Sequence, residues 1–256
     1  MSADTVSYER AGAAAVLTIT RPERRNAVDG PTAEALTAGY HAFVDDDDAR
    51  VLILTGAGED AFCAGADLKA IASFAPRLAD PAGPLGFTRL TAPKPTVAAI
   101  EGYCLAGGLE LALWCDLRIA GDGAQLGFPE RRWGVPLIDG GTQRLPRVVG
   151  LGRALDLILS GRIVAAEEAL GMGLLTELVP RGTALERALA CAEALAAFPQ
   201  ETMLADRRAA IEGLGLPIAE GLALEAQAGP AVFASAVEGA ARFAAGSGRG
   251  GLGAGW

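Results

Sequence analysis

The chain has 256 residues, with 22 basic and 31 acidic side chains and a formal net charge of −9. This acidic balance argues against a nucleic-acid-binding surface, and an apolar content of 51% excludes a disordered chain. The first ten residues lack a basic segment followed by an apolar one, so we expect no signal peptide. Apolar runs are too short to cross a membrane. We therefore expect a cytoplasmic protein with no membrane insertion, and the Ala-, Gly- and Arg-rich composition favours a bacterial source.

The histidine and cysteine content narrows the possible chemistry. The single histidine, His41, lies in an apolar-periodic stretch and is expected on a helix surface, which leaves no base for a Ser–His–Asp triad. The four cysteines show no C-x-x-C spacing, so we expect reduced core thiols and no metal site. The acidic run Asp45–Asp48 lacks the alternating ligands of a calcium loop and is interpreted as a solvated helix end.

Strands and helices alternate along most of the chain, which is typical of an α/β fold. A helix is expected from Asp29, a suitable N-cap, to about Asp45. After about Val179 the periodicity becomes helical, over 184–198, 200–213 and 217–243. The strands are predicted at Val16–Thr20, Val51–Thr55, Pro95–Glu101 and Asp116–Ala120. We divide the chain into a core at 1–183, a helical region at 184–245 and a mobile tail at 246–256.

Two glycine-rich turns stand before expected helix starts. They are Ala64–Leu68 and Ala106–Glu110. An N–H group at a helix start lacks an intrahelical partner and lies at the positive end of the helix dipole. Two such groups that converge form an oxyanion hole, and small residues let an acyl oxygen approach the main chain. Taken singly, each sequence is more simply an ordinary tight turn.

Two glutamates lie near these turns. Glu110 begins an otherwise apolar helix, where an unpaired carboxylate is costly to bury, and Glu130 follows Pro129. A pair of carboxylates is the simplest general acid–base set in a chain without a usable histidine. Either glutamate alone could instead be a paired or surface carboxylate.

Several motifs together resemble the crotonase (enoyl-CoA hydratase/isomerase) superfamily. Their order matches that of the family over roughly residues 5–245, which is almost the whole chain. The matching segments are Arg21–Val28, Ala61–Lys69, Gly102–Glu110 with Cys115-Asp116, Phe128–Glu130 and Gly140–Leu145.

The resemblance implies a spiral of repeated ββα units followed by a C-terminal helical region. It implies that this region assembles the chain into trimers, or into hexamers that are dimers of trimers. It also implies an acyl-CoA ligand. It implies that the N–H groups of Ala66 and Gly107 hold the thioester oxygen and that Glu110 and Glu130 are catalytic. The expected reaction is the reversible syn addition of water to a 2-trans-enoyl-CoA, with no cofactor besides the CoA of the substrate. The positions that match CoA contacts are Arg25, Ala27, Val28, Ala64, Asp67 and Leu68.

One residue departs from the family pattern and leaves alternatives open. Asp139 stands where typical hydratases carry a small residue, so it could contact the substrate or serve in another acyl-CoA reaction such as an isomerisation. It could equally cap the helix that starts near Gly140. A non-catalytic acyl-CoA-binding protein is a further alternative, which the two glutamates disfavour. A NAD-binding oxidoreductase would rest only on Gly56-Ala57-Gly58 with Ala61, a weak match with no helix expected after it.

Overall fold

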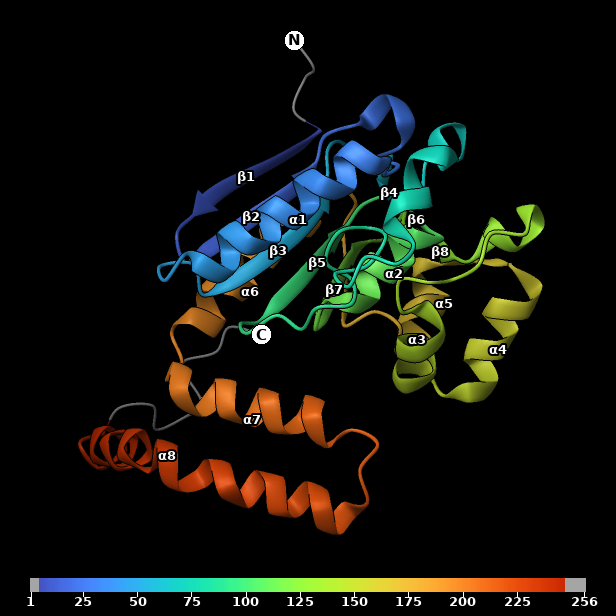
Figure 1. Ribbon diagram of the computed structural model, residues 1–256. Coiled ribbons are helices and arrows are strands. Elements are labelled where there is room, and N and C mark those ends of the chain that lie inside the picture. The colour runs from blue at the N-terminus through green and yellow to red at the C-terminus, as the bar shows by residue number, and fades with distance from the viewer. Residues whose placement is uncertain (1–4, 247–256) are drawn as a thin grey trace. The chain divides into compact units, whose positions relative to one another are not determined.

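Two sheets form the core of the computed structural model, which describes residues 5–246 (Figure 1). The six-stranded sheet is parallel except for β1, which pairs antiparallel with β2. Its order is β1 (Val6–Ala11), β2 (Ala14–Ile19), β3 (Val51–Gly56), β5 (Thr96–Ile100), β7 (Leu117–Gly121) and β10 (Glu177–Val179). The four-stranded sheet has the order β4 (Ala61–Cys63), β6 (Tyr103–Leu105), β8 (Gln125–Gly127) and β9 (Ile163–Ala165).

The chain alternates between the two sheets in a repeated pattern. Strands β3 and β4 precede the 3₁₀ helix η2 (Leu68–Arg77), and β5 and β6 precede α2 (Gly107–Trp114). Strands β7 and β8 then precede η3 (Pro129–Trp133) and α3 (Gly141–Val149). Each repeat therefore gives one strand to each sheet and then a helix, which confirms the predicted spiral of ββα units. The remaining 3₁₀ helix is η1 (Pro22–Arg24).

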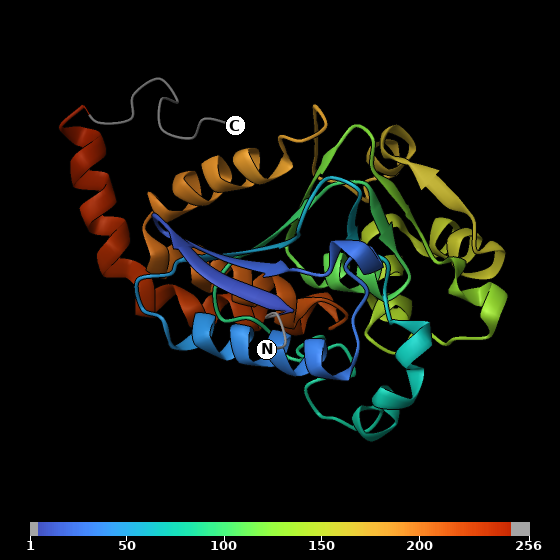
Figure 2. The same cartoon turned by 90° about the horizontal axis from the view of Figure 1, so that it is seen from above.

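The sequence predicted the central strands and the first long helix because their signals are local. Every residue of β5 and all but the last of β3 are buried, as continuous apolar runs predict for strands covered on both faces. Helix α1 (Gly30–Asp45) covers the sheet at its β1–β2 edge (Figures 1 and 2). The Asp29 carboxylate accepts the Thr32 N–H at 2.9 Å, as expected of an N-cap, and His41 is exposed.

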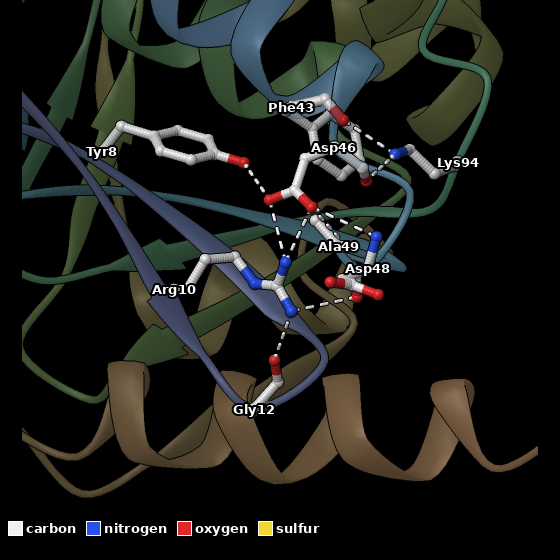
Figure 3. Close-up of polar contacts among 8 residues, drawn as sticks. All are labelled: Tyr8, Arg10, Gly12, Phe43, Asp46, Asp48, Ala49 and Lys94. Atoms are coloured by element: carbon white, nitrogen blue, oxygen red, sulfur yellow. Dashed lines mark hydrogen bonds and ion pairs between the residues drawn. The ribbon is translucent and has the colours of Figure 1, made fainter.

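The acidic run at the end of α1 is more ordered than a solvated helix end. Asp45, Asp47 and Asp48 are exposed, but Asp46 accepts hydrogen bonds from Arg10 at 2.7 Å and from the Tyr8 hydroxyl at 3.1 Å (Figure 3). The Lys94 ammonium donates to the carbonyls of Phe43 and Asp46, at 2.7 and 2.9 Å. A cation at these last carbonyls complements the helix dipole and fixes the C-terminus of α1.

The chain divides into two units, Met1–Ala192 and Glu193–Trp256. The first also contains α4 (Leu151–Ser160), α5 (Ala166–Gly171) and most of α6 (Ala184–Ala196). In the second, α7 (Gln200–Gly213) packs against α8 (Ile218–Ala244), as the helical periodicity predicted. The tail expected to be mobile lies, apart from Gly246, outside the described residues. Within the described part of the chain, no helix is long and apolar enough to cross a membrane.

Candidate active site

A short parallel pairing sets the direction of the Ala66 N–H. Val28 donates to the Gly65 carbonyl at 2.8 Å, and Asp67 donates to the Val28 carbonyl at 2.7 Å. In such a bridge the groups of the intervening residue point the other way, so the Ala66 N–H is directed away from Val28. Among the residues that the structure describes, no acceptor is found for it.

The second turn brings another free N–H group to the same place. Ala106 precedes α2 with φ 54° and ψ −126°, a conformation that costs a residue with a side chain about 1–3 kcal/mol. It places the Gly107 N–H at the first position of the helix, and within 5–246 no acceptor is found for this group either. A Cβ on Gly107 would lie 3.7 Å from the Ala66 nitrogen. The two predicted turns therefore meet, as an oxyanion hole requires.

Glu110 lies one turn into α2 and is only 2% exposed. Its Oε1 accepts the N–H of Gly141 at 2.7 Å and the N–H of Asp139 at 3.0 Å. Burial raises the pKa of its carboxyl to about 8, and the charges of Asp139 and Glu130 add to this rise, whereas the two N–H groups oppose it. Glu110 is therefore a buried but oriented carboxyl, able to hold or release a proton near neutral pH.

Glu130 lies in η3 and is 5% exposed. Neither carboxylate oxygen has a hydrogen-bond partner among the described residues, although both oxygens are buried. Burial raises the pKa of this carboxyl as well. Buried polar atoms are nearly always paired, so two unpaired oxygens on one glutamate mark a group suited to an external partner or to proton transfer.

Asp139 does not cap α3, so that prediction is wrong. The N-cap of α3 is Gly140, with φ 103° and no side-chain hydrogen bond to the helix. The Asp139 side chain is instead 3% exposed and accepts hydrogen bonds from the Leu85 N–H, at 3.0 Å, and from the Thr88 hydroxyl. Because the segment 85–88 offers two donors, the carboxylate turns toward it rather than toward the helix.

The positions expected to contact CoA lie together at the Val28–Ala66 pairing, but several of their groups already have partners. Asp67 forms an ion pair with Arg21 at 3.1 Å and caps η2 by accepting the Lys69 N–H. Ala27 and Val28 are buried, and their carbonyls accept from Arg21 and Asp67.

Three of these positions are more open. Arg25 is exposed, with its guanidinium 4.7 Å from the centre of the Tyr103 ring, and Leu68 is 44% exposed. Ala64 is half-buried and donates to the Arg25 carbonyl at 3.0 Å. The exposed Arg25 and Leu68 side chains can contact a ligand, and the CoA-contact role of all six positions stays a prediction.

No pattern in the sequence pointed to the segment 78–95, which has no helix or strand. Loops longer than about 12–15 residues without regular structure are uncommon and usually functional. Leu85 is 2% exposed, and its Cδ1 lies 2.6 Å from where a Cβ on Gly107 would stand, so its side chain packs against the oxyanion turn. No periodicity or motif pointed to Leu85 or Thr88, since only the tertiary fold brings them to the site.

The segment after Gly56–Gly58 is unfavourable to the dinucleotide-binding alternative. The chain continues from Gly56–Gly58 into β4 and not into a helix, which the dinucleotide fingerprint requires. In residues 5–246 no three His, Cys, Asp or Glu side chains are grouped as a metal site would need. All four cysteines are buried and free, as predicted for core thiols.

Known proteins resemble this chain over nearly its full length. The family model described as enoyl-CoA hydratase/isomerase matches residues 9–246. A probable enoyl-CoA hydratase of Rhizobium meliloti is 38% identical over 251 residues, which is 96% of each chain. A short-chain-enoyl-CoA hydratase of Clostridium acetobutylicum is 35% identical over 232 residues, which is 89% of each chain.

Solved structures share the fold as well as the sequence. The crystal structure of an enoyl-CoA hydratase from Mycobacterium tuberculosis has a TM-score of 0.88 and 38% sequence identity, with 94% of this chain and 95% of that chain covered. A probable enoyl-CoA hydratase/isomerase from Mycobacterium abscessus has a TM-score of 0.85 and 39% identity, with 94% and 96% covered.

Proposed function

The chain belongs to the enoyl-CoA hydratase/isomerase family, and from this premise we propose that it is an enoyl-CoA hydratase. The observation that carries the proposal is the pair of buried glutamates, Glu110 and Glu130, whose carboxyl pKa values are both raised. A hydratase needs one carboxylate that accepts a proton and one carboxyl that donates a proton. A protein that only binds acyl-CoA has no use for two buried carboxyls with raised pKa values.

In the proposed reaction, water adds across the double bond of a 2-trans-enoyl-CoA. Ionised Glu110 takes a proton from the water while the water oxygen bonds to C3. The π electrons of the double bond move toward the thioester. The N–H groups of Ala66 and Gly107 stabilise the charge on the thioester oxygen. Protonated Glu130 then gives its proton to C2, and the product is a 3-hydroxyacyl-CoA. Glu110 now holds the extra proton, which returns to Glu130 by exchange with solvent.

Burial supports a state in which one of the two carboxyls is protonated and the other is ionised. Two carboxylates in a low-dielectric site repel each other, so the pair favours the state that holds a single proton. The two N–H groups on Glu110 favour its ionised form, whereas no other described residue donates a hydrogen bond to the Glu130 carboxylate. This difference supports Glu110 as the acceptor and Glu130 as the donor, and burial, which raises the pKa of Glu110 to about 8, acts against the ionised form of Glu110. The reaction changes no oxidation state, so we expect no cofactor beyond the CoA of the substrate.

Assembly into trimers or hexamers is also part of the proposal. Helix α8 has no buried residue, and it exposes Ile218, Leu222 and Phe233 by 80%, 55% and 66%. Exposed apolar surface of this extent favours a contact with another chain. Light scattering should give a mass of three or six chains, and a stable 26.1 kDa monomer at micromolar concentration would contradict this.

We also propose a cytoplasmic location, since the substrate is an intracellular thioester.

The direct test of the proposed activity is the loss of enoyl absorbance with crotonyl-CoA, followed by identification of the product. A hydratase gives 3-hydroxybutyryl-CoA, whereas an isomerase leaves the mass of the substrate unchanged. Recovery of unchanged crotonyl-CoA, with binding intact, would favour the non-catalytic alternative.

A further inference from the structure

A continuous set of contacts joins the oxyanion turn to Glu110 through Asp139. The Leu85 side chain packs against Gly107, and the Leu85 main-chain N–H donates to the Asp139 carboxylate at 3.0 Å. The Asp139 main-chain N–H in turn donates to Glu110 Oε1 at 3.0 Å. One residue therefore contacts both the segment beside the oxyanion hole and the carboxyl of the proposed base.

Two further contacts hold this arrangement. The Thr88 hydroxyl donates to the same Asp139 oxygen that accepts from Leu85. The Arg144 guanidinium, from α3, donates to the carbonyl of Asp139 at 2.9 Å and to the carbonyl of Thr88. Thr88 is fully buried, so its hydroxyl would have no water to replace Asp139.

We propose that Asp139 is a positioning residue for the hydration reaction, which fixes the Leu85–Thr88 segment against the oxyanion turn and fixes Glu110 at the same time. The inference rests on the proposed function, and it gives Asp139 no contact with the reacting atoms. Its side chain is directed to the Leu85 N–H and the Thr88 hydroxyl, not to an open site. This role differs from the isomerase alternative, in which Asp139 would itself transfer a proton.

Charges around Asp139 make the role visible in a pH profile. Asp139 faces Glu110 on α2, Arg144 on α3 and Arg89 in the segment 78–95, and Glu110 also faces Glu130 on η3. The negative charge of Asp139 raises the pKa of Glu110. Removal of that charge alone should therefore lower the pKa of Glu110 and move the acidic limb of the rate profile to lower pH.

Two pairs of variants separate positioning from charge. Asp139→Asn keeps an oxygen that can accept both hydrogen bonds, whereas Asp139→Ala removes it. Thr88→Ser keeps the hydroxyl, whereas Thr88→Val removes it at nearly the same volume. The Thr88 pair decides the question even if Asp139→Ala fails to fold. Each is assayed with crotonyl-CoA over a range of pH, next to the wild-type enzyme.

We expect Asp139→Ala and Thr88→Val to lower kcat by about 10-fold or more, because a small misplacement of reacting groups can cost up to about 100-fold in rate. The KM for crotonyl-CoA should change by less than about threefold, because positioning acts on the chemical step. Asp139→Asn and Thr88→Ser should keep kcat within about threefold, and Asp139→Asn should shift the acidic limb to lower pH.

Wild-type kcat in folded Thr88→Val or Asp139→Ala would overturn the positioning role. Equal loss in Asp139→Asn and Asp139→Ala, with Thr88→Val normal, would overturn it too, because the carboxylate itself would then act on the substrate. Absence of hydration by the wild-type enzyme contradicts the proposed function instead, so the two failures are distinguishable.

Discussion

The two glutamate-bearing regions bury similar carboxyls in different ways. Glu110, on the apolar helix α2, has two main-chain N–H groups on one oxygen. Glu130, on the short helix η3, has no partner for either oxygen within the described residues. Burial raises the pKa of both, so the difference between them lies in orientation and not in exposure.

This difference shows how one environment can give two identical side chains separate tasks. N–H groups that point at an oxygen favour its negative charge and fix its direction. A carboxyl without donors favours the protonated form when it is buried. In the proposed reaction, the main-chain N–H groups of Gly141 and Asp139 therefore help to distinguish the proton acceptor from the proton donor.

The largest expected effect tests whether both carboxyls are needed. Glu110→Gln and Glu130→Gln should each lower kcat by about 10²–10⁴-fold, the range for general acid–base catalysis. The double variant should be little worse than the poorer single one, because both residues act in one transition state. The measurement is kcat with crotonyl-CoA, and near-normal turnover in either single variant contradicts the assignment.

A smaller loss is expected at the oxyanion hole, which both glutamates require. In Gly107→Ala the new Cβ would stand 2.6 Å from Leu85 Cδ1 and 3.7 Å from the Ala66 nitrogen, so it would displace Leu85 and crowd the proposed oxyanion hole. Turnover should fall by about 100-fold, as for the loss of one oxyanion donor. Calorimetric titration should show CoA affinity nearly unchanged.

The matched control for this glycine is Gly152→Ala in α4. A Cβ on Gly152 meets nothing within 4 Å, so we expect normal turnover. Gly107→Ala turnover equal to that of the control would mean that the oxyanion hole lies elsewhere.

Local signals were enough for much of this site, and tertiary contacts account for what was missed. The cap at Asp29, the buried strand at β3 and the two glycine turns each depend on a few neighbouring residues, so the sequence predicted them. The segment 78–95 has no periodicity, and Leu85 reaches Gly107 only after folding. The role of Asp139 could not be predicted for the same reason, since its donors lie more than 50 residues away in sequence.

A third expected effect concerns stability and tests the raised pKa of the Glu110 carboxyl. A carboxyl whose folded pKa is about 8 binds its proton more tightly in the folded state than in the unfolded state, where it is near 4.5. The folded enzyme therefore loses stability as pH rises from about 4.5 to 8, and Glu110→Gln removes that loss.

At pH 8 we expect Glu110→Gln to raise the free energy of unfolding by about 1–3 kcal/mol, and at pH 4 to leave it nearly unchanged. Urea denaturation at both pH values measures the difference. An equal effect at both pH values would show that the pKa of Glu110 is the same in the folded and unfolded states.

The smallest expected effect is at Asp46, a partly exposed carboxylate whose pKa is shifted in the opposite direction to those of the two glutamates. The hydrogen bond from Arg10 lowers the pKa of Asp46, opposite to the glutamates (Figure 3). Asp46→Asn should leave kcat within about twofold of wild type and change the urea midpoint only slightly, as is usual for surface ion pairs. A clear loss of kcat would show that the end of α1 is coupled to the active site.

Alkylation of the buried cysteine thiols can report how often the hydrophobic core of this enzyme opens. Cys63, Cys104 and Cys115 are 0%, 0% and 3% exposed, and burial raises the pKa of Cys63 to about 12. The reactive thiolate is therefore both scarce and shielded from alkylating reagents while the core is closed. Incorporation of iodoacetamide at these positions should follow the fraction of molecules whose core is open. A bound acyl-CoA should slow the labelling of Cys63, whose sulfur accepts the Gly65 N–H beside the oxyanion turn.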